Sequence, residues 1–245
     1  MKVVVLDLDG TLYKKKSVVL EMLSNFCKKR GYELSKIETE YKKAYNIIKQ
    51  SKKQHPSIKD FFSEVDKIFL ENIGLNANDE NLKELDQLAD EAKIKVLLEI
   101  EPRSHLRNFL INVKNRGLKT IVFSGSHDIH KQVELEPEKE SFSEKLEFKI
   151  QQLEKLNLID LIDEVIPTTK FGGYKPDLTI FKKLVEYLGC EPFECIMIGD
   201  SDNDMAAKDI GMKTILIGEG KGFKWHPQYV ANNFEEIDAI VRSMR

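Results

Sequence analysis

Short runs of aliphatic and β-branched residues recur along the chain, and polar or glycine-containing segments bound each of them. Continuous apolar runs of this kind are typical of strands that are buried on both faces of a parallel sheet. Helical spacings of three and four fill the segments between them, so the order of elements predicts a doubly wound, mainly parallel Rossmann-like α/β fold. The predicted strands are KVVVLDL (2–8), KTIVFSG (119–125), CIMIGD (195–200) and KTILIG (213–218), with DEVIPT (163–168) as a fifth candidate.

Residues 16–100, between the first two predicted strands, carry only helical patterns. Four amphipathic stretches each follow a polar residue suited to an N-cap, and Gly31 stands where the first stretch ends. Four helices without an intervening strand predict a small all-helical domain. We therefore expect an α/β core domain of residues 1–15 and 101–245 and a helical domain of residues 16–100. The expected helix starts are Ser17, Ser35 (in SKIE, which fits a capping box), Ser57 and Asn78.

The composition is that of a globular protein, since 41% of the 245 residues are hydrophobic and 32% are charged. The formal net charge is -3, so no overall basic field indicates binding to nucleic acid or to a membrane surface. The chain runs from Met1 into an apolar stretch that is too short for a signal peptide or a membrane span. We therefore expect a cytoplasmic protein, and no feature of the sequence decides its oligomeric state.

Three cysteines, Cys27, Cys190 and Cys195, are an odd number and do not form the pattern of a disulfide framework. Four residues separate Cys190 from Cys195, and no second Cys or His pair stands nearby, so zinc binding is not expected. We predict that all three are ordinary thiols.

Polar residues collect where the predicted strands end. Ligands of an open parallel sheet bind beyond the carboxyl ends of its strands, so these residues are expected to share one site. A lysine in GGYKPD, just before a predicted helix, adds a positive charge. The candidate site residues are Asp7, Asp9 and Thr11 after the first strand, Ser124 and Gly125 after the second, Lys175 in GGYKPD, and Asp200 and Asp204 from GDSDND.

Four carboxylates on one edge, those of Asp7, Asp9, Asp200 and Asp204, lower stability unless cations lie among them. Mg²⁺ fits best, because it takes oxygen ligands and is often held by carboxylates together with a substrate phosphate. Lys175 supplies a fixed positive charge to the same edge. The residues therefore predict a Mg²⁺-dependent site for phosphoryl transfer on a small phosphorylated metabolite.

Two acids can take two different roles in such a reaction. One carboxylate attacks phosphorus and becomes a transient aspartyl phosphate, and the other protonates the departing alkoxide and then activates water. The hydroxyl of Ser124 and the backbone N–H groups around Gly10 and Gly125 are expected to donate to phosphate oxygens. For Thr11 two roles stay open, because its hydroxyl suits either a phosphate contact or a brace for the turn.

These segments resemble the motifs of the haloacid dehalogenase superfamily, whose members are mostly Mg²⁺-dependent phosphatases, and the resemblance covers the whole chain. DLDGT resembles the first motif, which implies that Asp7 is the nucleophile and Asp9 the general acid/base. Relatives that cleave carbon–halogen bonds lack the second acid, so Asp9 favours ester hydrolysis. The helical insertion at 16–100 resembles the cap domain of the family, which closes over the site and selects the substrate.

Three further segments, VFSGS, GGYKPD and GDSDND, resemble the other motifs in the expected order. The resemblance implies a phosphate-binding Ser124, the motif lysine Lys175, the metal ligand Asp200 and its supporting acid Asp204. Asp202 is the alternative to Asp204 in that supporting position. The chain departs from compact relatives in the charged stretch 134–149, which is too short for a second cap domain and is interpreted as a helix extension or a flap.

Three alternatives to the phosphatase stay open. The same residues suit a phosphomutase, in which the aspartyl phosphate passes to a second hydroxyl. A receiver-like signalling domain also uses an acceptor aspartate, Mg²⁺, a hydroxyl and a lysine, but it takes its acids from different strands and carries no large insertion. A non-catalytic protein that binds phosphorylated metabolites is the third, and the intact pair of Asp7 and Asp9 argues against it.

Overall fold

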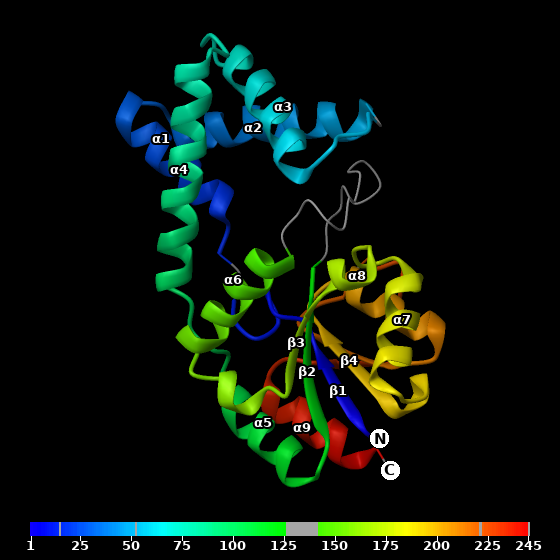
Figure 1. Cartoon of the computed structure of the whole chain (residues 1–245). Coiled ribbons are helices and arrows are strands. Elements are labelled where there is room, and N and C mark those ends of the chain that lie inside the picture. The colour runs from blue at the N-terminus through cyan, green and yellow to red at the C-terminus, as the bar shows by residue number, and fades with distance from the viewer. Residues whose placement is uncertain (15, 52, 126–141, 221, 245) are drawn as a thin grey trace. The chain divides into compact units, whose positions relative to one another are not determined.

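The computed structural model describes residues 1–14, 16–51, 53–125, 142–220 and 222–244 (Figure 1). These residues form two compact units. One is an α/β unit that contains residues 1–14 and the described residues after 99, and the other is a helical unit within residues 16–99. In the described part of the chain, no helix is both long and apolar enough to cross a membrane.

Six parallel strands form the sheet of the α/β unit, in the order β3-β2-β1-β4-β5-β6. The predicted parallel α/β class is confirmed. The sequence did not predict β6, because this strand has only three residues and exposes two of them. The strands are β1 (Val3–Leu6), β2 (Lys119–Ser124), β3 (Glu164–Pro167), β4 (Cys195–Gly199), β5 (Lys213–Ile217) and β6 (Tyr229–Ala231).

Helices cover both faces of this sheet (Figure 1), which is why its strands are apolar without alternation. On one face, Val3 and Val5 of β1 pack into a buried cluster with Phe181 of α7. On the other face, the rings of Phe109 in α5 and Phe234 in α9 lie 5.3 Å apart. The helices are α5 (Leu106–Asn115), α6 (Phe142–Lys155), α7 (Leu178–Leu188), α8 (Asp202–Met205) and α9 (Phe234–Ser243), with short 3-10 helices at Ile159–Leu161, Thr168–Phe171, Pro192–Glu194 and Ala206–Ile210.

The helical unit contains α1, α2, α3 and α4, with α1 packed on α4 and α2 packed on α3. Its core contains aliphatic and aromatic side chains. The ring centroid of Phe69 lies 5.7 Å from that of Phe26 and 5.2 Å from that of Tyr41, both in edge-to-face geometry. Such pairs stabilise a core beyond the area that they bury. The bounds are α1 (Val18–Arg30), α2 (Leu34–Ser51), α3 (Ile58–Asn72) and α4 (Asp79–Leu98).

Three of the four predicted helix starts are confirmed by capping hydrogen bonds. Ser17, Ser57 and Asn78 each accept a hydrogen bond from a backbone N–H group in the first turn of the helix that follows. The prediction for Ser35 is wrong, because α2 begins one residue earlier. The carbonyl of Glu33 accepts the first helical hydrogen bonds, and the hydroxyl of Ser35 donates to the Glu33 carboxylate at 2.6 Å.

Candidate active site

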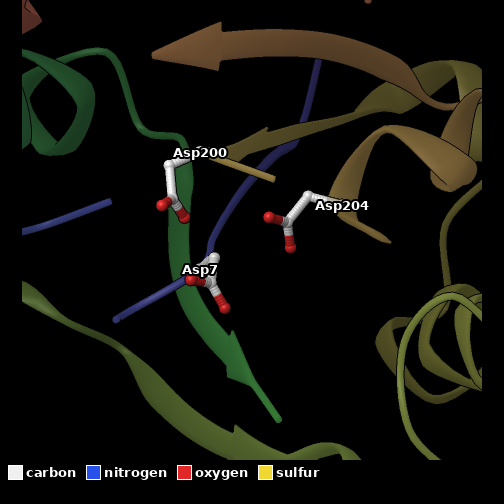
Figure 2. Close-up of side chains that lie close together, drawn as sticks. All are labelled: Asp7, Asp200 and Asp204. Carbon is white, nitrogen blue, oxygen red and sulfur yellow. The ribbon is translucent and has the colours of Figure 1, made fainter. Parts of the chain in front are cut away.

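Three acids from two strand ends converge in the α/β unit. Asp7 follows β1, Asp200 follows β4, and Asp204 lies in α8, the short helix after β4. One carboxylate oxygen from each lies within 4.8 Å of the others, and Figure 2 shows the three carboxylates facing a common space. The sheet order reverses at β1, between β2 and β4, which is where ligands bind in open α/β folds.

Lys175 lies between two of these acids and is fully buried. Its Nζ is 2.5 Å from Oδ1 of Asp7 and 2.5 Å from Oδ1 of Asp204, and it also donates to the carbonyl of Phe123 at 3.2 Å. Burial alone would lower the pKa of Lys175, yet the carboxylates of Asp204 and Asp7 raise it above its usual value. The ammonium group therefore stays charged and offsets part of the negative charge.

One lysine does not neutralise three acids. Burial raises the pKa of Asp7 to about 7 despite the opposing effect of Lys175, and burial also raises the pKa of Asp200. A further cation among these oxygens would favour the ionised carboxylates. Because the donors are all carboxylate oxygens, the group formed by Asp7, Asp200 and Asp204 fits a hard divalent cation such as Mg²⁺.

Two glycines allow the loops to approach this closely. A Cβ atom on Gly10 would lie 2.1 Å from Oδ2 of Asp200, and Gly10 also has a φ of +90°. A Cβ atom on Gly199 would lie 2.3 Å from Cγ of Asp204. Arg103 holds the loop that contains Gly10, since its Nε and Nη2 donate to the carbonyl of Gly10 at 3.0 and 2.6 Å.

The other residues of the first motif are placed differently. The Asp9 carboxylate, predicted as a fourth metal ligand, lies outside the three-acid group and accepts hydrogen bonds from Tyr13 and Gln152. The strand ends at Leu6 and the chain then turns, so alternate side chains no longer share a face. The hydroxyl of Thr11 donates to Asp200 at 3.2 Å, which is the bracing geometry, and a phosphate contact by Thr11 stays a prediction.

The predicted phosphate-binding residues lie beside this group. Ser124 ends β2, and its buried hydroxyl accepts a hydrogen bond from Nζ of Lys149 in α6 at 2.9 Å. The carbonyl of Gly125 accepts from the backbone N–H of Lys175 at 3.2 Å, which ties the second motif to the third. Of the two alternatives in GDSDND, Asp204 belongs to the group with Asp7 and Asp200. The Asp202 carboxylate instead accepts hydrogen bonds from the backbone N–H groups of Lys224 and Trp225.

Four further residues contact the candidate site and were not predicted from the sequence: Tyr13, Arg103, Lys149 and Gln152. None belongs to a motif at the end of a predicted strand. Lys149 had a weak signal, since it lies within the charged stretch 134–149. Residues 142–149 of that stretch belong to α6, as the helix interpretation expected, and 134–141 lie outside the described residues.

A family model of haloacid dehalogenase-like hydrolases matches residues 1–207. A glyceraldehyde 3-phosphate phosphatase of Methanocaldococcus jannaschii is 29% identical over 158 residues, which are 62% of this chain and 61% of the relative. A phosphoglycolate phosphatase of Aquifex aeolicus is 38% identical over 74 residues, 28% of this chain and 35% of the relative. The chain thus covers less than two thirds of either relative.

Solved structures agree with the fold. A hydrolase of the same type from Bacillus subtilis, solved with bound magnesium, superposes with a TM-score of 0.68 at 12% identity over 98% of each chain. The match to the family model over residues 1–207 is the stronger finding. The chain belongs to the haloacid dehalogenase-like hydrolase family.

Proposed function

We propose that the protein is a Mg²⁺-dependent phosphatase that hydrolyses a small phosphomonoester through an aspartyl phosphate on Asp7. One observation carries the proposal: Asp7 lies at the sheet switch point, in contact with a buried lysine and within reach of two further acids. That arrangement suits a nucleophile whose substrate brings additional negative charge. The two phosphatase relatives support the same activity.

In the proposed first step, a carboxylate oxygen of Asp7 attacks phosphorus and the ester oxygen departs. Asp9 gives that oxygen its proton, so that the leaving group departs as an alcohol. The hydroxyl of Ser124 and the charge of Lys175 hold the transferring group in line with Asp7. Asp9 then takes a proton from the water that hydrolyses the aspartyl phosphate, and Asp7 is regenerated.

Asp7, Asp200 and Asp204 are the residues that would hold Mg²⁺. When bound, the ion supplies charge neutralisation on the transferring phosphoryl group. Lys175 has a separate role, because its ammonium group already contacts the carboxylates of Asp7 and Asp204. Asp204, which is fully buried, would therefore contact both Lys175 and the ion.

The proposed substrate is a small phosphorylated metabolite, and the helical unit is the proposed cap that selects it. The names of the relatives point to three- and two-carbon phosphate esters as the first compounds to test. Phosphoglycolate and glyceraldehyde 3-phosphate differ in charge, so their relative rates report on how the site treats a second anionic group.

The test is release of inorganic phosphate from p-nitrophenyl phosphate, phosphoglycolate and glyceraldehyde 3-phosphate, with Mg²⁺ and with excess chelator. We expect hydrolysis that requires Mg²⁺ and that Asp7→Asn abolishes. Asp202→Asn is the matched control, because Asp202 lies outside the acid group. Absence of hydrolysis with every ester, or activity that survives in Asp7→Asn, contradicts the proposal. Isomerised ester in place of free phosphate indicates a mutase.

A further inference from the structure

Two side chains that the structure describes hydrogen-bond to the carboxylate of Asp9. The Tyr13 hydroxyl, four residues along the same loop, donates to Oδ1 of Asp9. Nε2 of Gln152, in α6, donates to the Tyr13 hydroxyl at 2.7 Å and to Oδ1 of Asp9 at 3.2 Å. The three side chains thus close a ring of hydrogen bonds, and all of them belong to the α/β unit.

Two of the three side chains are buried, and an atom of one of them has no hydrogen-bond partner among the described residues. Tyr13 is 3% exposed and Gln152 is 5% exposed. Among the described residues, Oε1 of Gln152 is buried without a hydrogen-bond partner. A buried polar atom of this kind destabilises a protein and needs an explanation. The amide orientation that leaves Oε1 unpaired is the one that directs Nε2 at Asp9, so the arrangement favours a donor on Asp9.

We propose that Tyr13 and Gln152 are positioning residues that fix the rotation of the Asp9 carboxylate for proton transfer. The proposal rests on the proposed function, in which Asp9 protonates the leaving oxygen. Both hydrogen bonds end on Oδ1 of Asp9, so together they restrict the rotation of its carboxylate group. General acid catalysis requires the carboxyl group to lie within hydrogen-bond reach of the leaving group, and a freely rotating group meets that condition only part of the time.

The test separates proton transfer from the rest of the reaction. Gln152→Met and Tyr13→Phe remove the donors and keep most of the side-chain volume. We measure kcat/KM for a series of substituted phenyl phosphates, from p-nitrophenyl phosphate to phenyl phosphate. Because nitrophenolate departs without a proton, its kcat/KM should change little, whereas that of phenyl phosphate should fall about 10- to 100-fold. The dependence of rate on leaving-group basicity therefore steepens in both variants.

Two reference variants give the largest and the smallest expected change in slope. Asp9→Asn should show the same steepening at its full extent, and Gln151→Met, on the exposed side of the same helix, should match the parent protein. An equal loss for all leaving groups in Gln152→Met and Tyr13→Phe indicates a structural role and overturns the proposal, as does an unchanged slope. A parent protein that hydrolyses no aryl phosphate overturns the proposed function as well, so the two failures are distinguishable.

A second, independent observation concerns Cys190 and Cys195. Their Sγ atoms lie 3.0 Å apart, although four residues separate them in the chain. Cys190 follows α7, and Cys195 is the first residue of β4. The pair therefore lies at the end of the sheet opposite to Asp7. Cys27 belongs to the helical unit, so it serves as an internal reference.

We infer that Cys190 and Cys195 form an oxidative modification site that a low-molecular-weight disulfide such as oxidised glutathione converts into an intramolecular disulfide. The half-buried Cys190 reacts first and releases one glutathione, and Cys195 then attacks the Cys190 sulfur and releases the second. Two protein S–H bonds are lost and one S–S bond forms. The two electrons and two protons end on two molecules of reduced glutathione.

The test uses the full chain under native conditions with excess oxidised glutathione. We expect the mass to fall by that of two hydrogen atoms and one of the three thiols to remain titratable after denaturation. Cys27→Ser should still lose two thiols, whereas Cys190→Ser should lose none to an intramolecular bond. Hydrolysis of p-nitrophenyl phosphate should be unchanged by oxidation. Three persisting thiols, or a stable glutathione adduct on the parent protein, overturn the inference.

Discussion

The two units of the molecule place their charged side chains in different environments. In the α/β unit, fully buried Lys175 contacts two acids, and the nearby Asp200 adds a third carboxylate. In the helical unit, ion pairs such as Lys42–Glu38 lie on the surface, and the interior is built from aromatic and aliphatic side chains. Buried charges stabilise a fold poorly, whereas apolar packing does so directly. We infer that the buried charges of the α/β unit serve chemistry and not stability.

Lys175→Met removes the buried ammonium group of the α/β unit, and we expect a large effect. The substitution leaves Asp7 and Asp204 buried without their ammonium partner, so we expect the free energy of unfolding to fall by about 3–5 kcal/mol. Hydrolysis should be lost with it. Urea denaturation followed by circular dichroism measures the first effect, and phosphate release measures the second.

The matched control is Lys42→Met, which removes a lysine from an exposed pair of the helical unit. It should leave both the denaturation midpoint and hydrolysis unchanged. Equal midpoints for the two lysine variants would show that buried and exposed ion pairs contribute equally to stability, which would contradict the expected difference between the units.

Phe69→Ala tests the other side of the comparison. Phe69 is fully buried and contacts the rings of Phe26 and Tyr41, so the cavity should destabilise the helical unit by about 3 kcal/mol. Because the two units have separate buried clusters, hydrogen exchange should accelerate in α1–α4 and stay slow in β1 and β4. Faster exchange in both units would show that the clusters are coupled.

Most of the fold could be predicted because buried parallel strands leave a local signal. Four strands and the candidate fifth were visible as apolar runs, and the helix starts at Ser17, Ser57 and Asn78 were visible as N-caps. The failures occur where the local signal is ambiguous. Ser35 has the residues of a capping box, but Glu33 provides the first helical carbonyl. Residues 229–231 form the strand β6 because they pair with β5, and their own sequence does not indicate a strand.

The candidate site could be predicted only where a residue stands at a strand end. Asp7 and Asp200 satisfy that condition, and parallel strands bring their ends to one edge. Gln152 does not, because it reaches Asp9 from the last turn of a helix that starts more than a hundred residues later. Such contacts depend on how a helix packs, and one sequence does not fix the rotation of a helix about its axis.

Asp66→Asn tests a half-buried acid of the helical unit. Burial raises its pKa to about 7, although the Tyr41 hydroxyl donates to it at 3.1 Å and opposes the rise. The folded state thus keeps the proton between about pH 4 and pH 7 while the unfolded chain releases it. Stability therefore falls as pH rises through that range, by at most about 1.4 kcal/mol per pH unit.

Asparagine keeps an acceptor for Tyr41 and does not titrate, so Asp66→Asn should lose this fall. Urea denaturation of both proteins between pH 5 and pH 8 measures it, and the two stability curves should diverge as pH rises. Parallel curves would place the titration of Asp66 close to that of an ordinary surface carboxylate.

Glu84→Gln has the smallest expected effect, because its partner Arg30 keeps another contact. Arg30 lies 2.5 Å from Glu84 and also 4.4 Å from the centroid of the Phe26 ring. The hydrogen bond from Arg30 lowers the pKa of Glu84, so the pair contributes stability above the usual glutamate pKa and loses it as pH falls. At neutral pH we expect a loss of about 0.5–1 kcal/mol, measured by urea denaturation. Because both side chains are partly exposed, the loss should shrink in about 1 M salt. A loss that persists in high salt would indicate that packing against Phe26, rather than charge, links α1 to α4.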